Sequence, residues 1–237
     1  MTARPIRDSP VKRAIVERVS VSGEDLAREF RISRVAVWKH VEELRRLGYR
    51  IESGRRGYVL LDKPDLPYPW ELCVKSVYLM ETDSTMNVAW SMKDWTFVIA
   101  GKQRAGRGRR GRRWFSPPGG LYFSMIFSPK MPLTSTGELS EVVLGSITEY
   151  LGNLGIEVSS KENGLYIDGK KLGGVLVEAM GELDEVKKAV VGVGLNVRNP
   201  VPERGISLAM VLNDVSLLDV ARRLLPLVEE SLRRFLR

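Results

Sequence analysis

A short segment with an unusual density of arginine and glycine is the part of this sequence best suited to chemistry. Residues 103–114 contain six arginines and three glycines. Glycine lets backbone N–H groups approach an anion closely, and guanidinium groups form paired hydrogen bonds with phosphate or carboxylate. The segment therefore predicts a loop that binds a ligand carrying phosphate or carboxylate groups.

Three other interpretations of this segment are open: a flexible Arg/Gly stretch that binds RNA, a solvated basic loop and a disordered tail. RNA-binding stretches of this kind are usually terminal or long, whereas this one lies inside a domain. It also continues directly into the aromatic and proline-containing run Trp114–Phe123. We therefore favour an ordered loop that grips a ligand.

The elements that would position this loop alternate between strands and helices. Helical patterns are expected over Ser140–Leu154 and Leu217–Leu236. The runs typical of strands are Val74–Met80, Phe97–Gly101, Leu121–Phe127, Leu172–Ala179 and Ala189–Val197. This order predicts an α+β domain with a mixed or antiparallel sheet.

The first sixty residues predict three helices and a hairpin. Apolar residues recur at helical spacing in Val11–Ser20, while Ser22 and Ser33 can cap two further helices, the last of which ends at Gly48. Alternating residues on both sides of the basic segment 53–57 predict the hairpin. This is the order of a winged helix-turn-helix, whose last helix enters the DNA major groove.

The charge distribution also favours DNA as a partner of this region. Residues 1–63 hold 15 Lys/Arg and 9 Asp/Glu, so they carry +6 of the net charge of +8. Arginine can read guanine edges, and lysine can neutralise phosphate. The candidate DNA-binding residues are Ser33, Arg34, Trp38, Lys39, Arg55 and Arg56. A basic domain that binds another protein is the alternative.

Three prolines within residues 64–69 predict a linker. We therefore divide the chain into a DNA-binding domain (1–63), a linker (64–70) and a second domain (71–237). No apolar run approaches the roughly 18 residues of a membrane span, so we expect a cytoplasmic protein without a membrane partner. The single cysteine, Cys73, and the single histidine, His40, argue against a disulfide or a Cys/His metal centre, and we expect Cys73 to be buried.

Residues 106–117, Gly-Arg-Gly-Arg-Arg-Gly-Arg-Arg-Trp-Phe-Ser-Pro, resemble the signature loop of the biotin protein ligases. Other segments resemble this family in the same order along the chain. They are the DNA-binding motifs 22–26 and 33–40 of the bifunctional members, the biotin-pocket segment Thr82–Thr85, the active-site lysine strand Asp168–Glu178 and the Gly-x-Gly-Leu-Asn strand Gly192–Val197. The resemblance covers most of residues 10–236.

The resemblance implies a class II synthetase-like catalytic domain that makes biotinyl-5′-AMP from biotin and MgATP. Biotin would then pass to a lysine of the biotin carboxyl carrier protein, and the same chain, as a homodimer, would repress biotin genes by binding their operator DNA. The implied biotin-binding residues are Ser84, Thr85, Gln103, Gly106, Arg107, Gly192 and Gly194. The implied ATP or adenylate residues are Arg109, Arg110, Trp114, Asn163, Lys171 and Asn196. Lys171, Arg107 and Arg109 are the implied catalytic residues, and Lys171 would lie between the acid's carboxylate and the α-phosphate.

One segment departs from the family pattern. Family members usually carry Lys-Trp-Pro-Asn-Asp at the position of Ser160–Gly164, so only Asn163 matches. This segment borders the ATP phosphates and metal in the family. A non-catalytic regulator that senses biotin or its adenylate is therefore the alternative function, and a lipoate-type ligase is a more distant one. Many ligases also continue into a small C-terminal β-barrel, which we expect this chain to lack.

Overall fold

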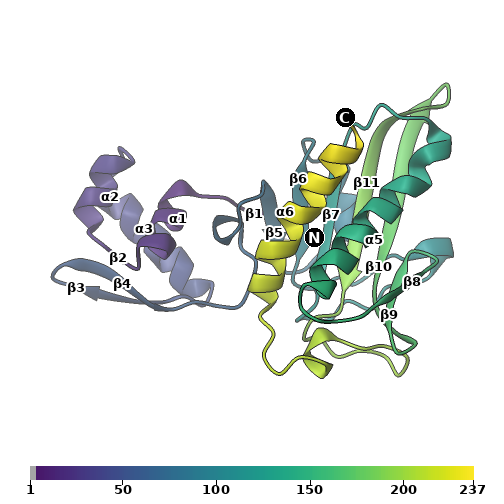
Figure 1. The fold of residues 1–237 in the computed structure, drawn as a ribbon. Helices are drawn as coiled ribbons and strands as arrows, with labels where there is room; N and C mark the ends of the chain where they lie inside the picture. The colour runs from purple at the N-terminus through teal and green to yellow at the C-terminus, as the bar shows by residue number, and fades with distance from the viewer. Residues whose placement is uncertain (1–3) are drawn as a thin grey trace.

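The N-terminal part of the chain folds as three helices and a small sheet (Figure 1). The computed structural model describes residues 4–237. The elements of this part, in chain order, are α1 (Pro10–Arg18), β2 (Ser20–Val21), α2 (Gly23–Glu29), α3 (Arg34–Arg46), β3 (Arg50–Gly54) and β4 (Gly57–Asp62). The sheet has the order β2–β4–β3, and its longer hairpin forms the wing. The predicted winged helix-turn-helix is confirmed.

Capping and burial explain why these helices form where they do. The Ser22 and Ser33 hydroxyls accept hydrogen bonds from backbone N–H groups three residues further on, at 3.3 and 3.1 Å. Each cap satisfies one donor that the first helical turn leaves free. On α3, Val37, Val41 and Leu44 are completely buried and form the side that faces the core.

The second part is built on an eight-stranded sheet of order β1–β5–β6–β7–β11–β10–β9–β8. Its strands are β1 (Ile6–Arg7), β5 (Ser76–Leu79), β6 (Thr96–Ala100), β7 (Leu121–Phe127), β8 (Ser159–Lys161), β9 (Gly164–Ile167), β10 (Lys170–Glu182) and β11 (Glu185–Leu195). The β5–β6 pair is parallel and the other pairs are antiparallel. The sheet is therefore mixed, and the α+β prediction is confirmed.

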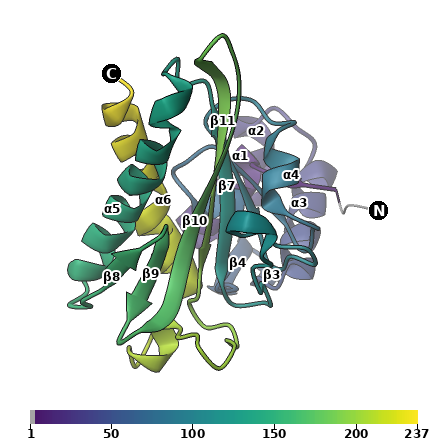
Figure 2. The ribbon, with the colours of Figure 1, turned by 90° about the vertical axis from the view of Figure 1, so that its right-hand side faces the viewer.

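Helices lie on both faces of this sheet but cover them unequally (Figure 2). The long helices α5 (Thr136–Gly152) and α6 (Leu217–Phe235) lie over one face and bury most of the apolar core. The short α4 (Thr85–Ala89) lies on the other face, above a smaller apolar cluster that includes Met86 and Ala89. Four short 3-10 helices occur at Pro69–Glu71, Arg109–Gly111, Leu133–Ser135 and Leu208–Met210. The α4 face is the one with room for a ligand.

The two parts are joined by more than the linker. Strand β1 precedes the DNA-binding fold in sequence, yet it pairs with β5 of the large sheet. In the linker, the Asp65 carboxylate accepts hydrogen bonds from the Ser216 hydroxyl and from the first N–H groups of α6. The buried Glu71 carboxylate is paired with Lys63 and Arg222 and accepts a hydrogen bond from the Tyr49 hydroxyl. The junction is therefore held by charged and hydrogen-bonded contacts.

One expectation about the surface was wrong. Cys73 is exposed: it lies in a bend just before β5, between the buried Leu72 and Val74. Within residues 4–237, no helix is both long and apolar enough to cross a membrane.

Candidate active site and DNA-binding surface

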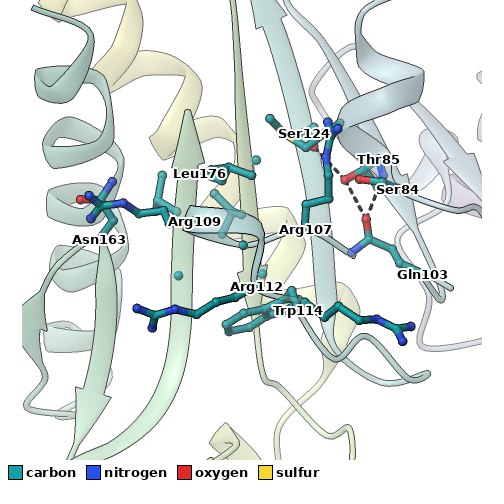
Figure 3. A pocket seen from close by; sticks show the side chains of 18 of the residues that line it. Ser84, Thr85, Gln103, Arg107, Arg109, Arg112, Trp114, Ser124, Asn163 and Leu176 are labelled. Atoms are coloured by element: carbon teal, nitrogen blue, oxygen red, sulfur yellow. Dashed lines mark hydrogen bonds between the residues drawn. The ribbon is translucent and has the colours of Figure 1, made fainter. Parts of the chain in front are cut away.

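The predicted ligand residues converge on one pocket on the α4 face of the sheet (Figure 3). Its floor comes from residues of β10 and β11, its side from the start of α4, and its cover from the Arg/Gly loop. The predicted residues that line it are Ser84, Thr85, Gln103, Arg107, Arg109, Arg110, Trp114, Asn163, Lys171, Gly192 and Gly194. Segments that are far apart in sequence thus meet at a single cavity.

Glycines on β11 make room for the larger side chains of the pocket. A Cβ atom on Gly194 would lie 2.2 Å from Trp114 Nε1, and one on Gly192 would lie 2.4 Å from Met86 Sδ. Real Cβ contacts are essentially never that short, so any other residue at these positions would displace the neighbouring side chain. The two glycines therefore determine where Trp114 and Met86 lie.

A chain of hydrogen bonds organises one end of the pocket (Figure 3). The Gln103 side-chain oxygen accepts from the Thr85 backbone N–H at 2.8 Å and from the Thr85 hydroxyl at 3.2 Å. The Thr85 and Ser124 hydroxyls lie 2.7 Å apart, and the Gln103 amide donates to Ser116. Since Thr85 uses its proton toward Gln103, Ser124 donates to Thr85 and keeps acceptor capacity facing the pocket.

Two polar atoms of the pocket are buried without a hydrogen-bond partner among the described residues. They are the Ser84 hydroxyl oxygen and Trp114 Nε1. Leaving such a group unpaired costs about 1–3 kcal/mol, so native proteins rarely do so unless a ligand or water completes the site. The pocket thus offers unused hydrogen-bonding capacity at Ser84 and at Trp114.

The Arg/Gly loop is ordered by its own backbone. Gly108 donates to the Arg112 carbonyl and Trp114 donates to the Gly106 carbonyl, each at 2.8 Å. Between them the chain makes a tight turn, with Arg110 at φ 56° and Gly111 at φ 72°. A flexible RNA-binding stretch would not need this closed pattern, so the ordered, ligand-gripping interpretation is favoured.

Side chains of this loop reach the neighbouring strands. Arg109 donates to the Glu162 backbone carbonyl at 3.0 Å. Arg107 pairs with Glu178 of β10, and the distance between Arg107 Nη2 and Glu178 Oε2 is 3.0 Å. Trp90 donates to the same Glu178 oxygen at 3.4 Å. Arg107 is thus paired with a carboxylate of the chain itself, that of Glu178.

Positive charge dominates the other end of the pocket. Five arginines and Lys171 line the pocket as a whole, and Glu162 is the one acidic residue among the described lining residues. Burial, together with the nearby Arg112 guanidinium, lowers the pKa of Lys171 below its ordinary value. The Lys171 ammonium also lies 5.3 Å from the centre of the Trp114 ring. Such an excess of cations over carboxylates is suited to an anionic ligand.

Two predicted residues do not line the pocket. Asn196 is buried and donates to the backbone carbonyls of Lys171 and Ile206, so it holds the start of β10 rather than facing the cavity. Gly106 packs against the other end of the Arg/Gly loop, where a Cβ would lie 2.5 Å from the Trp114 carbonyl oxygen. Their contacts are consistent with positioning roles.

The segment that departs from the family pattern forms a tight turn between β8 and β9. Glu162 and Asn163 have φ values of 48° and 64°, as in a two-residue hairpin turn. Asn163 and Glu162 border the pocket, whereas Lys161 is exposed and does not line it. No group of three or more potential metal ligands occurs among residues 4–237.

Ser124 and Arg112 are pocket residues that the sequence patterns did not identify. Ser124 is the one hydroxyl-bearing side chain besides Tyr122 in the buried strand Leu121–Phe127, and a lone serine in such a run is a usable signal. Arg112 lies within the Arg/Gly segment, but sequence alone does not tell which of six arginines turn inward. In the structure five of the six line the pocket, whereas Arg104 pairs with Glu81 and Asp83.

The candidate DNA-binding residues gather on a second surface. Arg34, Trp38 and Lys39 are exposed on α3, and Arg55 and Arg56 lie at the tip of the β3–β4 hairpin. Ser33 is used as the cap of α3. Among residues 4–237, none of these five arginine, lysine or tryptophan side chains takes part in an ion pair. They remain available to an anionic partner.

Comparisons with known proteins match both parts of the chain. The model of the biotin/lipoate A/B protein ligase family matches residues 79–196, and a helix-turn-helix domain model matches residues 13–59. The bifunctional ligase/repressor BirA of Bacillus spizizenii is 35% identical over 195 residues, which cover 75% of this chain and 60% of that protein. The Escherichia coli protein of the same name is 32% identical, with 74% and 59% covered. The chain therefore spans about 60% of the length of these curated relatives.

A solved structure gives the same result for the fold. The biotin protein ligase from Aquifex aeolicus in complex with biotin and ATP is 33% identical, with a TM-score of 0.58, over 68% of this chain and 71% of that chain. The apo structure of the same ligase superposes with a TM-score of 0.56 at 28% identity.

Proposed function

Because this chain belongs to the biotin/lipoate A/B protein ligase family, we propose that it makes biotinyl-5′-AMP and transfers biotin to a lysine of a biotin carboxyl carrier protein. One observation carries this proposal. The pocket joins an uncharged polar end at Ser84, Thr85 and Ser124 to a cationic end at Lys171 and the Arg/Gly loop. Biotin has a matching distribution of polar groups, with an uncharged ureido ring at one end and a carboxylate at the other.

The uncharged end fits the ureido ring. Its carbonyl oxygen is an acceptor, which the unpaired Ser84 hydroxyl can satisfy by donating. Its N–H groups are donors, and the acceptor capacity of Ser124 and Thr85 faces them. In this arrangement the Gln103 amide holds Thr85 and Ser116 and keeps its second N–H for the ligand.

The cationic end fits the reacting groups. A carboxylate oxygen of biotin attacks the α-phosphorus of ATP, and pyrophosphate leaves. The attack brings two anionic groups together, so a nearby cation that contacts both lowers the barrier. We assign this role to Lys171, assisted by Arg107 and Arg109, while Arg110 and Asn163 border the phosphates. The carrier lysine amine then attacks the carbonyl carbon of the mixed anhydride, and AMP leaves. An ordered loop over the anhydride would keep water away.

The described residues do not form a metal cage. Glu162 is the only carboxylate among the pocket's described lining residues, and no cluster of three potential ligands is present in residues 4–237. Mg²⁺ usually keeps several waters and binds through substrate phosphates with one or two carboxylates. We therefore propose that Mg²⁺ arrives with ATP and that no step depends on protein metal ligands.

Exchange of labelled pyrophosphate into ATP tests the ligase function. The purified protein with biotin and MgATP should catalyse exchange that depends on biotin, because adenylate formation is reversible. A Lys171→Met variant should lose most of this exchange while still binding biotin. Absence of exchange in wild-type protein that binds biotin would overturn the ligase proposal.

A second candidate function rests on the β8–β9 turn. Ser160 and Gly164 stand where the family pattern has lysine and aspartate, and the exposed Lys161 does not line the pocket. A chain that holds the adenylate without making it would be a regulator that senses biotin or biotinyl-5′-AMP. Tight binding of synthetic biotinyl-5′-AMP together with no pyrophosphate exchange would favour this candidate over the ligase.

We also propose that the winged helix-turn-helix binds operator DNA of biotin genes as part of a homodimer in the cytoplasm, with no membrane partner. The exposed cations of α3 and of the hairpin tip support DNA as the partner. A dimer is proposed because helix-turn-helix proteins generally bind paired half-sites as dimers. The protein should retard a duplex containing the promoter of its own biotin genes at lower concentration than a scrambled duplex. Equal affinity for the two at moderate salt would contradict a role in regulation.

A further inference from the structure

The exposed face of α3 carries two large apolar side chains. Val35 is 61% exposed and Trp38 is 50% exposed. They are three residues apart, so they lie on one face of the helix, opposite the buried Val37, Val41 and Leu44. Single exposed apolar residues are common, but two neighbours on a helix that is also cationic mark a contact surface.

These side chains line a hollow between α3 and the wing. The residues that form it are Ser22, Gly23, Glu24, Arg34, Val35, Trp38 and the hairpin residues Ser53 to Tyr58. Its acidic member, Glu24, is paired with Arg28 at 3.4 Å. Arg34, Arg55 and Arg56 line the same hollow and take part in no ion pair within the described part of the chain. The hollow thus combines exposed apolar side chains with cations.

Duplex DNA matches this distribution of charge and apolar surface. Phosphate groups are bound by cations, which the three arginines of the hollow supply. In the major groove, the one apolar group that a base pair presents is the 5-methyl group of thymine, and apolar side chains contact it. A phosphate or a guanine edge would give Val35 and Trp38 nothing to bind.

We infer that Val35 and Trp38 read thymine through its 5-methyl group. The inference rests on the proposed DNA-binding function and deepens it: arginines hold the backbone and guanine edges, and the apolar pair adds a preference for thymine at fixed positions. Each methyl group that leaves water contributes about 0.8 kcal/mol, which is about fourfold in affinity.

Replacing thymine by deoxyuridine tests this inference directly, because it removes the methyl group and leaves base pairing and the O4 acceptor unchanged. The probe is a duplex selected from random-sequence DNA by the full-length protein. Deoxyuridine is then placed at one thymine at a time, and the dissociation constant is measured for each duplex. We expect one or more positions at which binding weakens about fourfold.

Variants assign the effect to the two residues. The double variant Val35→Ala Trp38→Ala should bind the thymine and deoxyuridine duplexes with the same affinity at those positions. Both side chains are exposed, and alanine favours helix more than valine or tryptophan, so α3 should remain folded. Leu61→Ala is the matched control, because Leu61 is 44% exposed in the same domain and does not line the hollow. It should keep the deoxyuridine effect.

The outcomes separate this inference from the function on which it rests. Selection of a specific duplex with no deoxyuridine effect at any position would overturn thymine reading and leave DNA binding intact. An effect that persists in the double variant would also overturn it. Failure to select any duplex would remove both, and would indicate that the apolar pair contacts a protein instead.

Discussion

Thr85 connects three parts of the pocket through one hydroxyl group and one backbone N–H. We expect Thr85→Val to lower biotin affinity about 5- to 30-fold, since losing hydrogen bonds to Gln103 and Ser124 costs about 1–2 kcal/mol. Isothermal titration calorimetry with biotin measures the loss.

Thr96→Val is the control for this change. Thr96 is also a buried threonine, but its hydroxyl has no hydrogen-bond partner among the described residues. Removing that hydroxyl should leave biotin affinity unchanged and leave the free energy of unfolding equal or higher. Equal losses of affinity in the two variants would show that the Thr85 network has no special role.

Lys171 gives the pocket a defined response to pH. Its pKa is lowered in the folded protein, so between that lowered value and 10.5 the unfolded chain binds more protons, and stability rises with pH in this window. An anionic adenylate beside the ammonium raises the pKa again. Binding should therefore take up protons in the window, which calorimetry in two buffers of different ionisation enthalpy detects.

Substitution tells whether Lys171 is the group that takes up the proton. Lys171→Met should abolish the uptake, whereas Lys170→Met, an exposed neighbour on the same strand, should keep it. Uptake that is unchanged in Lys171→Met would contradict the assignment of the phosphate contact to this residue.

At the scale of elements, glycine in β11 leaves the space that Trp114 of the Arg/Gly loop occupies. Gly194→Ala should weaken binding of biotinyl-5′-AMP at least tenfold, because the added methyl group cannot coexist with Trp114 in its present place. Fluorescence titration of the tryptophans with the adenylate measures the change.

Gly145→Ala separates this effect from a general effect of glycine replacement. Gly145 is exposed in α5, and a Cβ atom added there would have no other atom within 4 Å outside its own stretch of helix. Alanine should stabilise the helix by about 0.5–1 kcal/mol and leave adenylate binding unchanged. Normal adenylate affinity in Gly194→Ala would show that Trp114 can move without consequence.

Elements with a clear apolar pattern were predictable, including the short strands β5 and β6, and short elements without such a pattern were not. The helices α5 and α6 and the strands β7 and β11 have enough residues for the apolar pattern to identify them. By contrast, α4 has five residues, little more than one turn, and its sequence Thr-Met-Asn-Val-Ala has no distinctive period. β8 has three exposed residues, so alternation between core and solvent is absent.

For the site, sequence resemblance named most pocket residues but not what each one touches. It cannot show that the Gln103 amide holds Thr85 and Ser116, or that Arg107 pairs with Glu178, because both depend on partners 13 to 71 residues away. Tertiary distances decide these roles, and local sequence does not encode them.

At the scale of the whole molecule, Glu71 connects the DNA-binding part to the large-sheet part. Its side chain is fully buried, and it contacts Lys63, Tyr49 and Arg222 from both halves. Glu71→Gln should lower the free energy of unfolding by about 1–3 kcal/mol, because a neutral amide leaves the two cations uncompensated. Limited proteolysis should then cut within residues 63–70 faster than in the wild type.

Glu230→Gln provides the comparison. Its pair with Arg234 on α6 is exposed, so the change should be within about 0.5 kcal/mol and proteolysis should be unchanged. If both variants behave alike, the junction does not depend on Glu71.

The pairing of β1 with β5 has a practical meaning for anyone who separates the two halves. Residues 6 and 7 belong to the large sheet although the DNA-binding fold follows them. Both ends of the DNA-binding fold are therefore connected to the ligase domain. A ligase half begun at residue 64 would lose this flanking strand and expose the backbone N–H and C=O groups of β5. An exposed sheet edge is a template for pairing between molecules, so such a fragment should form larger aggregates than the intact chain does.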